Sequence, residues 1–231
     1  MTCIPPSSKQ SRTTTSVCRR SKSQISRQVS STHKLESKRQ FLQLVPTQRV
    51  ALKFPFVDRL NDGASAFKYT PPQLVSAENL IAFLGSTIYG DTVAGSFEPS
   101  CDAYASNGPN ETYMRAYALV EFLLPNARPV ADMSFRTAAR IPYTIDTFVN
   151  VLNQPLFGDG IPLCDNYITL FNTTVTTGEY APVPVEGTLA VRPPLYPNDE
   201  MFEYVYGFQM ANAFVERNGV VCGSLKGYSG R

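Results

Sequence analysis

Residues 1–40 contain no aromatic side chain and consist mainly of Ser, Thr, Gln, Lys and Arg. Such a segment cannot bury enough apolar surface to offset the entropy of ordering it, so we expect it to be disordered on its own. The first aromatic residue is Phe41. The sequence therefore predicts a tail, residues 1–40, and one folded domain, residues 41–231.

The folded domain reads as short strands separated by turns. The clearest strand lies in residues 113–124, where Met114, Ala116, Ala118, Val120, Phe122 and Leu124 form a wholly apolar set on one parity. This alternation is typical of a half-buried strand. Further strands are expected at 41–52, broken or bulged at Pro46, and at 143–152, 166–177 and 183–194, on their β-branched and apolar content.

Residues 202–214 also alternate, with aromatic side chains and Met210 on one parity. A helix over 199–216 is the alternative, but its apolar residues would surround the whole cylinder, which favours a strand. Asn218-Gly219 follows between apolar runs, and this pair predicts a two-residue hairpin turn.

One short helix is expected at 76–86, with Ser76 as its N-cap, Leu80, Ile81 and Leu84 on one face, and Gly85 as its stop. Short strands without alternating helices predict a mainly β fold, an antiparallel β-sandwich or barrel.

The sequence offers little enzyme chemistry. Its only histidine is His33, inside the tail, which removes His-based triads and most zinc sites. No P-loop, dinucleotide fingerprint or serine-nucleophile elbow is present. Carboxylate pairs could form among the acids of the domain, although solvated surface acids are the simpler interpretation. We expect neither an enzyme nor a cofactor.

The cysteines are far apart and form no C-x-x-C pair. Thiols in a reducing compartment are the simplest expectation. Asp199, Glu200 and Glu203 form an acidic loop that is a candidate for calcium binding, particularly between two subunits; the alternative is a turn with solvated charges. Aromatic and Met residues in 68–75 and 196–202 are candidates for an interface, or for the core.

Charge is divided unequally along the chain. Residues 1–53 carry +10 and residues 54–231 carry −8, which together give the net charge of +2. A flexible cationic tail of this kind suits the tracking of phosphates on single-stranded RNA without reading bases. The nine cations of the tail are Lys9, Arg12, Arg19, Arg20, Lys22, Arg27, Lys34, Lys38 and Arg39.

Three other roles compete for the tail. A cleaved transit peptide for an organelle is also rich in Arg and Ser and poor in acids. A polybasic patch on an anionic membrane is a second possibility, but neither an amphipathic helix nor a lipidation site supports it, and we expect no membrane association. A tail without any partner is the third.

A basic Ser/Thr-rich arm of about forty residues before a Trp-free, Pro-rich β domain resembles the coat proteins of small plant RNA viruses, including those of the ourmiavirus type. The resemblance covers the whole chain and is architectural. It implies a jelly-roll β-sandwich that self-associates into a shell and an arm that packages genomic RNA. It also implies location in the virion, with assembly in the host cytoplasm. We refer to residues 1–40 below as the basic arm.

Overall fold

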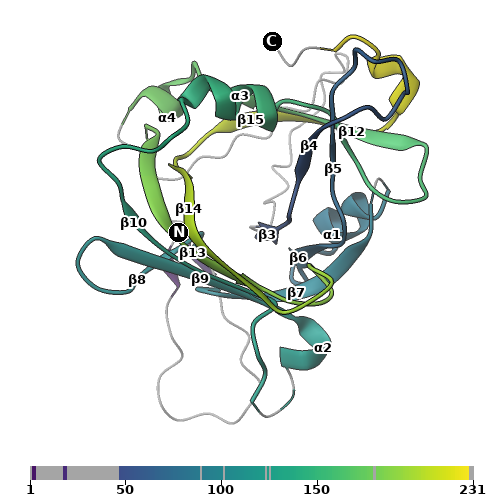
Figure 1. The fold of residues 1–231 in the computed structure, drawn as a ribbon. Coiled ribbons are helices and arrows are strands. Elements are labelled where there is room, and N and C mark those ends of the chain that lie inside the picture. The colour runs from purple at the N-terminus through teal and green to yellow at the C-terminus, as the bar shows by residue number, and fades with distance from the viewer. Residues whose placement is uncertain are drawn as a thin grey trace, which may run out of the picture.

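The computed structural model describes residues 47–228, except 89, 101, 123, 125, 179 and 180, together with residues 2–3 and 18–19. The described chain is mainly β, which confirms the predicted fold class. Two curled sheets face each other, with short helices at their margins (Figure 1).

The larger sheet has eight strands in the order β14-β13-β10-β9-β7-β6-β3, with β8 beside β9. Six of its seven pairings are antiparallel, and β6 and β7 pair in parallel across helix α1. Its strands are β3 (Arg49–Val50), β6 (Gln73–Ser76), β7 (Thr92–Glu98), β8 (Ala105–Ser106), β9 (Glu111–Ala118), β10 (Ala131–Thr137), β13 (Val183–Val191) and β14 (Glu200–Gln209).

The smaller sheet has five strands in the order β15-β12-β11-β5-β4. Here β11 and β5 are parallel and the other pairs are antiparallel. Its strands are β4 (Phe54–Val57), β5 (Phe67–Tyr69), β11 (Leu156–Phe157), β12 (Leu163–Leu170) and β15 (Ala213–Val221), and a separate pair joins β1 (Thr2–Cys3) to β2 (Cys18–Arg19). The two parallel pairs make both main sheets mixed, and jelly-roll connectivity is not confirmed.

Strand β9 follows the predicted alternation. Met114, Ala116 and Ala118 are buried, and Ala116 and Met114 lie opposite Ala131 and Met133 of β10. The strand ends earlier than predicted because the chain turns into helix α2 (Leu119–Phe122). Strand β13 confirms the prediction for 183–194, and β14 confirms that for 202–214 only as far as Gln209. Residues 210–212 lie outside any strand and Ala213 begins β15. Strand β14 excludes the helical alternative.

The strand expected at 143–152 is wrong. Helix α3 (Ile145–Leu152) forms there, because the Thr144 side chain accepts a hydrogen bond from the backbone N–H of Thr147 and Asp146 lies in the first turn. Both features stabilise a helix N-terminus. Likewise β12 ends at Leu170, and the rest of the expected strand forms the one-turn helix α4 (Thr174–Thr177).

Helix α1 (Leu80–Ser86) forms where a helix was predicted, but its ends differ. Asn79 is the N-cap, since its side-chain oxygen accepts a hydrogen bond from the Ala82 N–H at 3.0 Å. Ser76 instead ends β6, and Gly85 lies inside the helix.

The hairpin turn predicted at Asn218-Gly219 is also wrong. The pair lies within β15, where the register with β12 shifts between Cys164 and Asn166, so the extra residue forms a β-bulge. Gly219 has φ of +69°, a conformation that favours glycine in a turn and in a bulge alike. A two-residue hairpin turn of type I′ would require a positive φ at Asn218 as well, and Asn218 does not have one.

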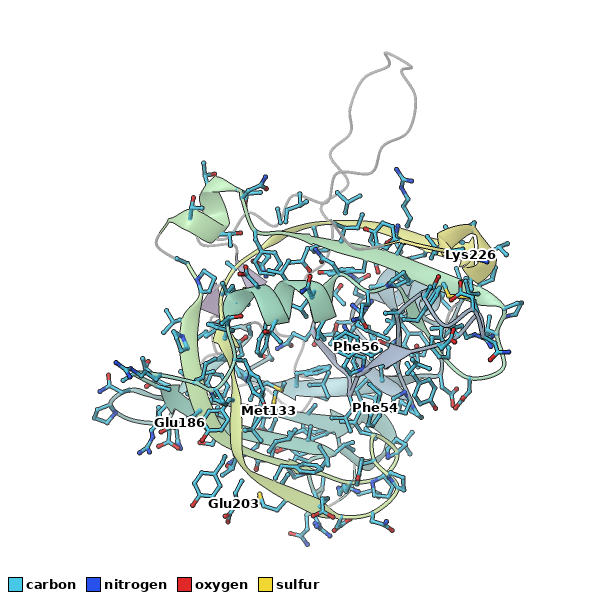
Figure 2. All side chains as sticks on the ribbon, turned by 45° about the horizontal axis from the view of Figure 1, so that its top comes forward. Phe54, Phe56, Met133, Glu186, Glu203 and Lys226 are labelled. Atoms are coloured by element: carbon cyan, nitrogen blue, oxygen red, sulfur yellow. A yellow bond between two sulfur atoms is a disulfide. The ribbon has the colours of Figure 1, made fainter. Side chains whose placement is uncertain are left out.

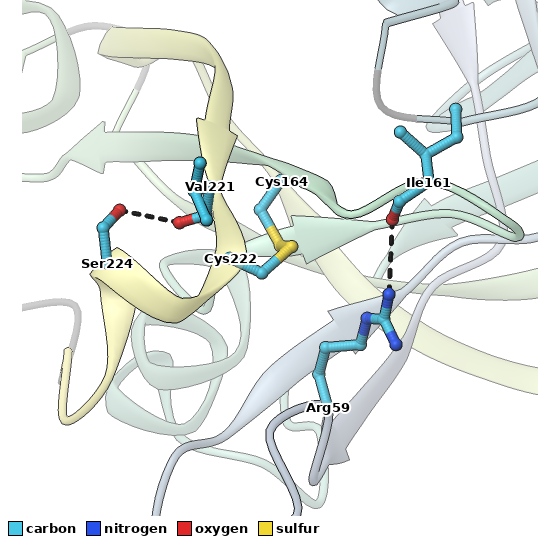
Figure 3. The surroundings of a disulfide bond; sticks show 6 residues. All are labelled: Arg59, Ile161, Cys164, Val221, Cys222 and Ser224. Carbon is cyan, nitrogen blue, oxygen red and sulfur yellow. Dashed lines mark hydrogen bonds between the residues drawn. A yellow bond between two sulfur atoms is a disulfide. The ribbon is translucent and has the colours of Figure 1, made fainter.

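Two apolar clusters stabilise the fold. One lies on the larger sheet and includes Leu74, Phe97 and Val130; the other surrounds Phe67 on the smaller sheet. The second cluster contains a disulfide between Cys164 of β12 and Cys222, the first residue of the 3₁₀ helix η1 (Cys222–Leu225) (Figure 3). The expectation of free thiols is wrong for these two cysteines.

Candidate functional site

The predicted RNA-binding cations lie almost entirely outside the described residues. Arg19 is the exception, because it belongs to β2 and its backbone pairs with Thr2 of β1. The cations outside the described residues are Lys9, Arg12, Arg20, Lys22, Arg27, Lys34, Lys38 and Arg39.

The acidic loop proposed for calcium is spread along the start of β14. Asp199 forms an ion pair with Arg128 at 2.7 Å, and both side chains are exposed. Glu200 and Glu203 follow on the strand itself, with Glu203 at the margin of the molecule in Figure 2. No three potential ligands gather into a metal site within the described residues. A site completed by a second subunit stays a prediction.

Charged side chains from both sheets meet around the fully buried Asp165, together with Asn218, which is itself exposed. We call this group the buried ionic cluster. Its members come from β3, the segment before β4, β5, β12 and β15, and are Arg49, Lys53, Lys68, Asp165, Glu216 and Asn218. Asp165 has no solvent-exposed surface and Lys68 only 1%. Such complete burial of two ionisable side chains is unusual, and each of them needs a hydrogen bond or an opposite charge nearby.

The bulge in β15 brings Asn218 onto the carboxyl groups. With its amide nitrogen turned toward them, Asn218 donates to Glu216 Oε1 at 3.2 Å and to Asp165 Oδ1 at 3.0 Å. The second oxygen of Asp165, Oδ2, accepts no hydrogen bond from the described residues. One carboxyl of the pair is therefore only half satisfied.

The cations of the cluster are held by other groups. Arg49 lies 3.9 Å from Glu216 and donates to the Ser86 hydroxyl of α1 at 3.1 Å. The Lys68 ammonium donates to the backbone carbonyl of Leu152 at the end of α3. Arg49 thus joins an edge strand of the larger sheet to an edge strand of the smaller sheet.

Burial governs protonation in the cluster. Burial, followed by the nearby Glu216 charge and a hydrogen bond with Glu216, raises the pKa of Asp165 to about 7. Burial and repulsion from Lys53 lower the pKa of Lys68 to about 7, and burial followed by repulsion from Arg49 lowers the pKa of Lys53. The cluster can therefore take up or release protons near neutral pH.

Perturbed acids and amines of this kind can serve general acid–base catalysis, but such a group must reach its substrate. Asp165 and Lys68 have almost no accessible surface, so this conformation offers them to no substrate. The arrangement can store a proton and join strands.

No protein-family model, curated protein or solved structure matches this chain.

Helix α1 turns its apolar face toward solvent and not toward the core. Its apolar residues Leu80, Ile81 and Leu84 are 63%, 67% and 54% exposed, while the polar Ser86 is buried. Ile88, just beyond the helix, is also exposed. A helix normally turns its apolar face toward the core, and an exposed apolar face marks an interaction surface.

Strand β14 is a second exposed apolar element. It pairs with β13 on one side, and no described strand pairs with its other side. It has no Lys, Arg or Pro, residues that commonly protect an edge strand from pairing with other chains. Its exposed apolar side chains are Met201, Phe202, Tyr204 and Val205.

The candidate interface residues differ in exposure. Met201 and Phe202 of 196–202 are exposed, whereas Tyr69 of 68–75 is half-buried and packs against the Phe67 cluster. An interface at either segment stays a prediction. No helix in the described part of the chain is long and apolar enough to span a membrane.

The free energy available at α1 is modest. Fully burying a Leu or Ile side chain contributes about 1.5–3 kcal/mol, so covering the exposed half of each contributes about 1 kcal/mol. Leu80, Ile81, Leu84 and Ile88 together would give ~4 kcal/mol, near the lower limit of what association costs. The α1 face alone cannot hold a stable dimer, but it suits one of several contacts that an assembly repeats.

Proposed function

We propose that this chain is a structural protein that self-associates through its β domain and binds single-stranded RNA through its basic arm, as coat proteins of small plant RNA viruses do. The observation that carries the proposal is the division of charge, +10 in residues 1–53 against −8 in residues 54–231. An acidic domain repels RNA, so binding is confined to the arm.

The exposed elements of the domain support self-association. The α1 face and β14 present apolar side chains to solvent at two separate elements, and the α1 face alone is too small for a stable interface. A symmetric shell can be stable even when each contact is weak, because every subunit makes all of its contacts at the same time.

The proposal places the protein in the virion, with assembly in the host cytoplasm. The disulfide between Cys164 and Cys222 is compatible with this order if it forms after the particle leaves the reducing cytoplasm. Calcium held between subunits by Asp199, Glu200 or Glu203 and jelly-roll connectivity belong to the same proposal.

Size-exclusion chromatography tests the proposal directly. The full chain would be compared with a variant beginning at Phe41, which keeps every strand of both main sheets. Absorbance at 260 and 280 nm would be read across each peak, before and after RNase, and the nucleic acid identified separately. We expect large particles that contain RNA only when the arm is present.

Two clean monomers free of nucleic acid would contradict the proposal. They would favour the alternative, a soluble β protein imported into an organelle after cleavage of its first 30–40 residues. The mass of the protein isolated from its natural source separates these two functions, since a coat protein keeps its arm.

A further inference from the structure

We infer that the carboxyl groups of Asp165 and Glu216 share one proton at neutral pH and that loss of this proton weakens the link between the two sheets. The geometry points to a proton, because the Asn218 amide nitrogen lies 3.0 Å from Asp165 Oδ1 and 3.2 Å from Glu216 Oε1, which gathers both carboxyl groups around one atom. Asp165 has no exposed surface, so a second negative charge beside Glu216 would not be hydrated there. The inference concerns the folded subunit and does not depend on the proposed function.

The elements packed around Asp165 each bring a charged or polar side chain toward it. Arg49 approaches from β3, Lys53 from the segment before β4 and Lys68 from β5. Glu216 and Asn218 approach from β15, and α1 contributes only the Ser86 hydroxyl, which holds Arg49. No ion pair to Asp165 forms within the described residues, so a new negative charge there has no direct partner.

Ionisation of Asp165 would therefore place two carboxylates side by side within the fold. Like charges repel strongly beside a carboxyl group that has no exposed surface. Burial and Glu216 raise the pKa of Asp165 to about 7, consistent with this repulsion. Glu216 is also the carboxylate that Arg49 approaches, so disturbing it disturbs the connection between β15 and β3.

The sign of the pH dependence follows from the direction of this shift. An acid whose folded-state pKa lies above its unfolded value binds its proton more tightly when folded, so stability falls as pH rises from about 4 toward 7. Lys68, whose pKa is lowered, acts in the opposite direction, mainly above pH 7. The informative window is therefore pH 5–7.

The test is urea unfolding of the full-length wild type, Asp165→Asn and Asp91→Asn at pH 5, 6 and 7. Asparagine imitates the protonated acid, and Asp91 is an exposed matched control. We expect the unfolding equilibrium constant of the wild type and of Asp91→Asn to rise about tenfold or more from pH 5 to 7. That of Asp165→Asn should change less than about twofold. An equal rise in Asp165→Asn, or no rise in the wild type, would overturn the inference.

Glu216→Gln provides a second variant should Asp165→Asn fail to fold. It removes the neighbouring negative charge, so Asp165 releases its proton at lower pH and the rise between pH 5 and 7 shrinks. An unchanged rise would count against the shared proton.

Amide hydrogen exchange locates the effect. Between pH 5 and 7, protection factors should fall in β3 and β15 of the wild type, hold in β10, and hold everywhere in Asp165→Asn. An equal fall in β10 would show that the proton controls global stability and not the link between the sheets.

Discussion

Burial at a single residue, Lys68, lowers the pKa of its ammonium group to about 7, so this lysine loses its proton far more readily than a lysine in water. It lies between Phe67 and Tyr69 in β5, and both faces of this strand are covered, so the lysine is as buried as its apolar neighbour. Burying an ammonium group is costly, and one hydrogen bond to the Leu152 carbonyl offsets little of that cost.

Replacing Lys68 with Met should therefore stabilise the protein. Methionine keeps the length of the side chain and removes the buried charge, and we expect a gain of about 1–2 kcal/mol at pH 6 after the lost hydrogen bond is counted. Because the folded-state pKa of Lys68 is lowered to about 7, the penalty that Met removes shrinks as pH rises, and the gain should decrease toward pH 9. Urea unfolding at several pH values measures it, with the exposed Lys226→Met as control. A loss of stability at pH 6 would contradict the prediction.

Position 187 requires glycine because the backbone of the neighbouring strand β10 leaves no room for a side chain. It lies in β13 opposite Phe135, and a Cβ there would come within 2.0 Å of the Ser134 carbonyl oxygen and 2.6 Å of the Phe135 Cα. Both are backbone atoms, which cannot move aside without breaking the strand pairing.

Gly187→Ala should lower the free energy of unfolding by roughly 2–4 kcal/mol, as overpacking against fixed atoms does. Gly223→Ala is the matched control, since nothing lies within 4 Å of its Cβ position. Thermal unfolding of the two variants compares them directly. Equal stabilities would mean that β13 and β10 separate easily at this point.

At the scale of elements, local sequence signals predicted whether a segment forms a helix or a strand better than they predicted what that segment packs against. The alternation in β9, the β-branched and apolar content of β13 and the apolar spacing of α1 were recognisable because each depends on neighbours in sequence. Helix α3 was missed because its β-branched residues suggested a strand, while Thr144 and Asp146 stabilise the helix end. The reversed burial of α1 could not be predicted, because it depends on what the helix packs against.

The buried ionic cluster lies beyond sequence reasoning for the same reason. Lys68 and Asp165 are almost a hundred residues apart, and the strand order β5-β11-β12 places them in one sheet. A lysine between two aromatic residues was the one local signal, and it does not reveal its partners. By contrast, the RNA-binding role of the basic arm was predicted from composition alone, which needs no tertiary contact, and it stays a prediction.

The bulge at Asn218-Gly219 gives the prediction at this scale. Replacing both residues with Val should lower stability by about 2 kcal/mol or more, because valine cannot adopt φ of +69° without strain and Asn218 no longer donates to Asp165 and Glu216. Thermal unfolding measures the loss. Val221→Thr, at an exposed position of the same strand, is the control. A change no larger than that of the control would show that β15 forms without the bulge.

At the scale of the whole molecule, one chain joins two regions of opposite net charge. The domain carries acids in excess and the basic arm carries nine cations. Electrostatic attraction to RNA comes from counterion release, so its salt dependence counts the cations engaged. If all nine bind single-stranded RNA, the slope of log K against log salt is about −6.

Replacing Arg19, Arg20, Lys22 and Arg27 together with Ala leaves five cations and should flatten this slope to about −3.5. Fluorescence anisotropy with a labelled single-stranded RNA at several salt concentrations measures both values. Arg140→Ala with Arg217→Ala removes two exposed cations of the domain and should leave the slope near −6, because an acidic domain contributes no phosphate contacts. If the fourfold variant kept the wild-type affinity at every salt concentration, the arm would not be the RNA-binding element. If the control variant lost as much slope, the domain would share in binding despite its net charge.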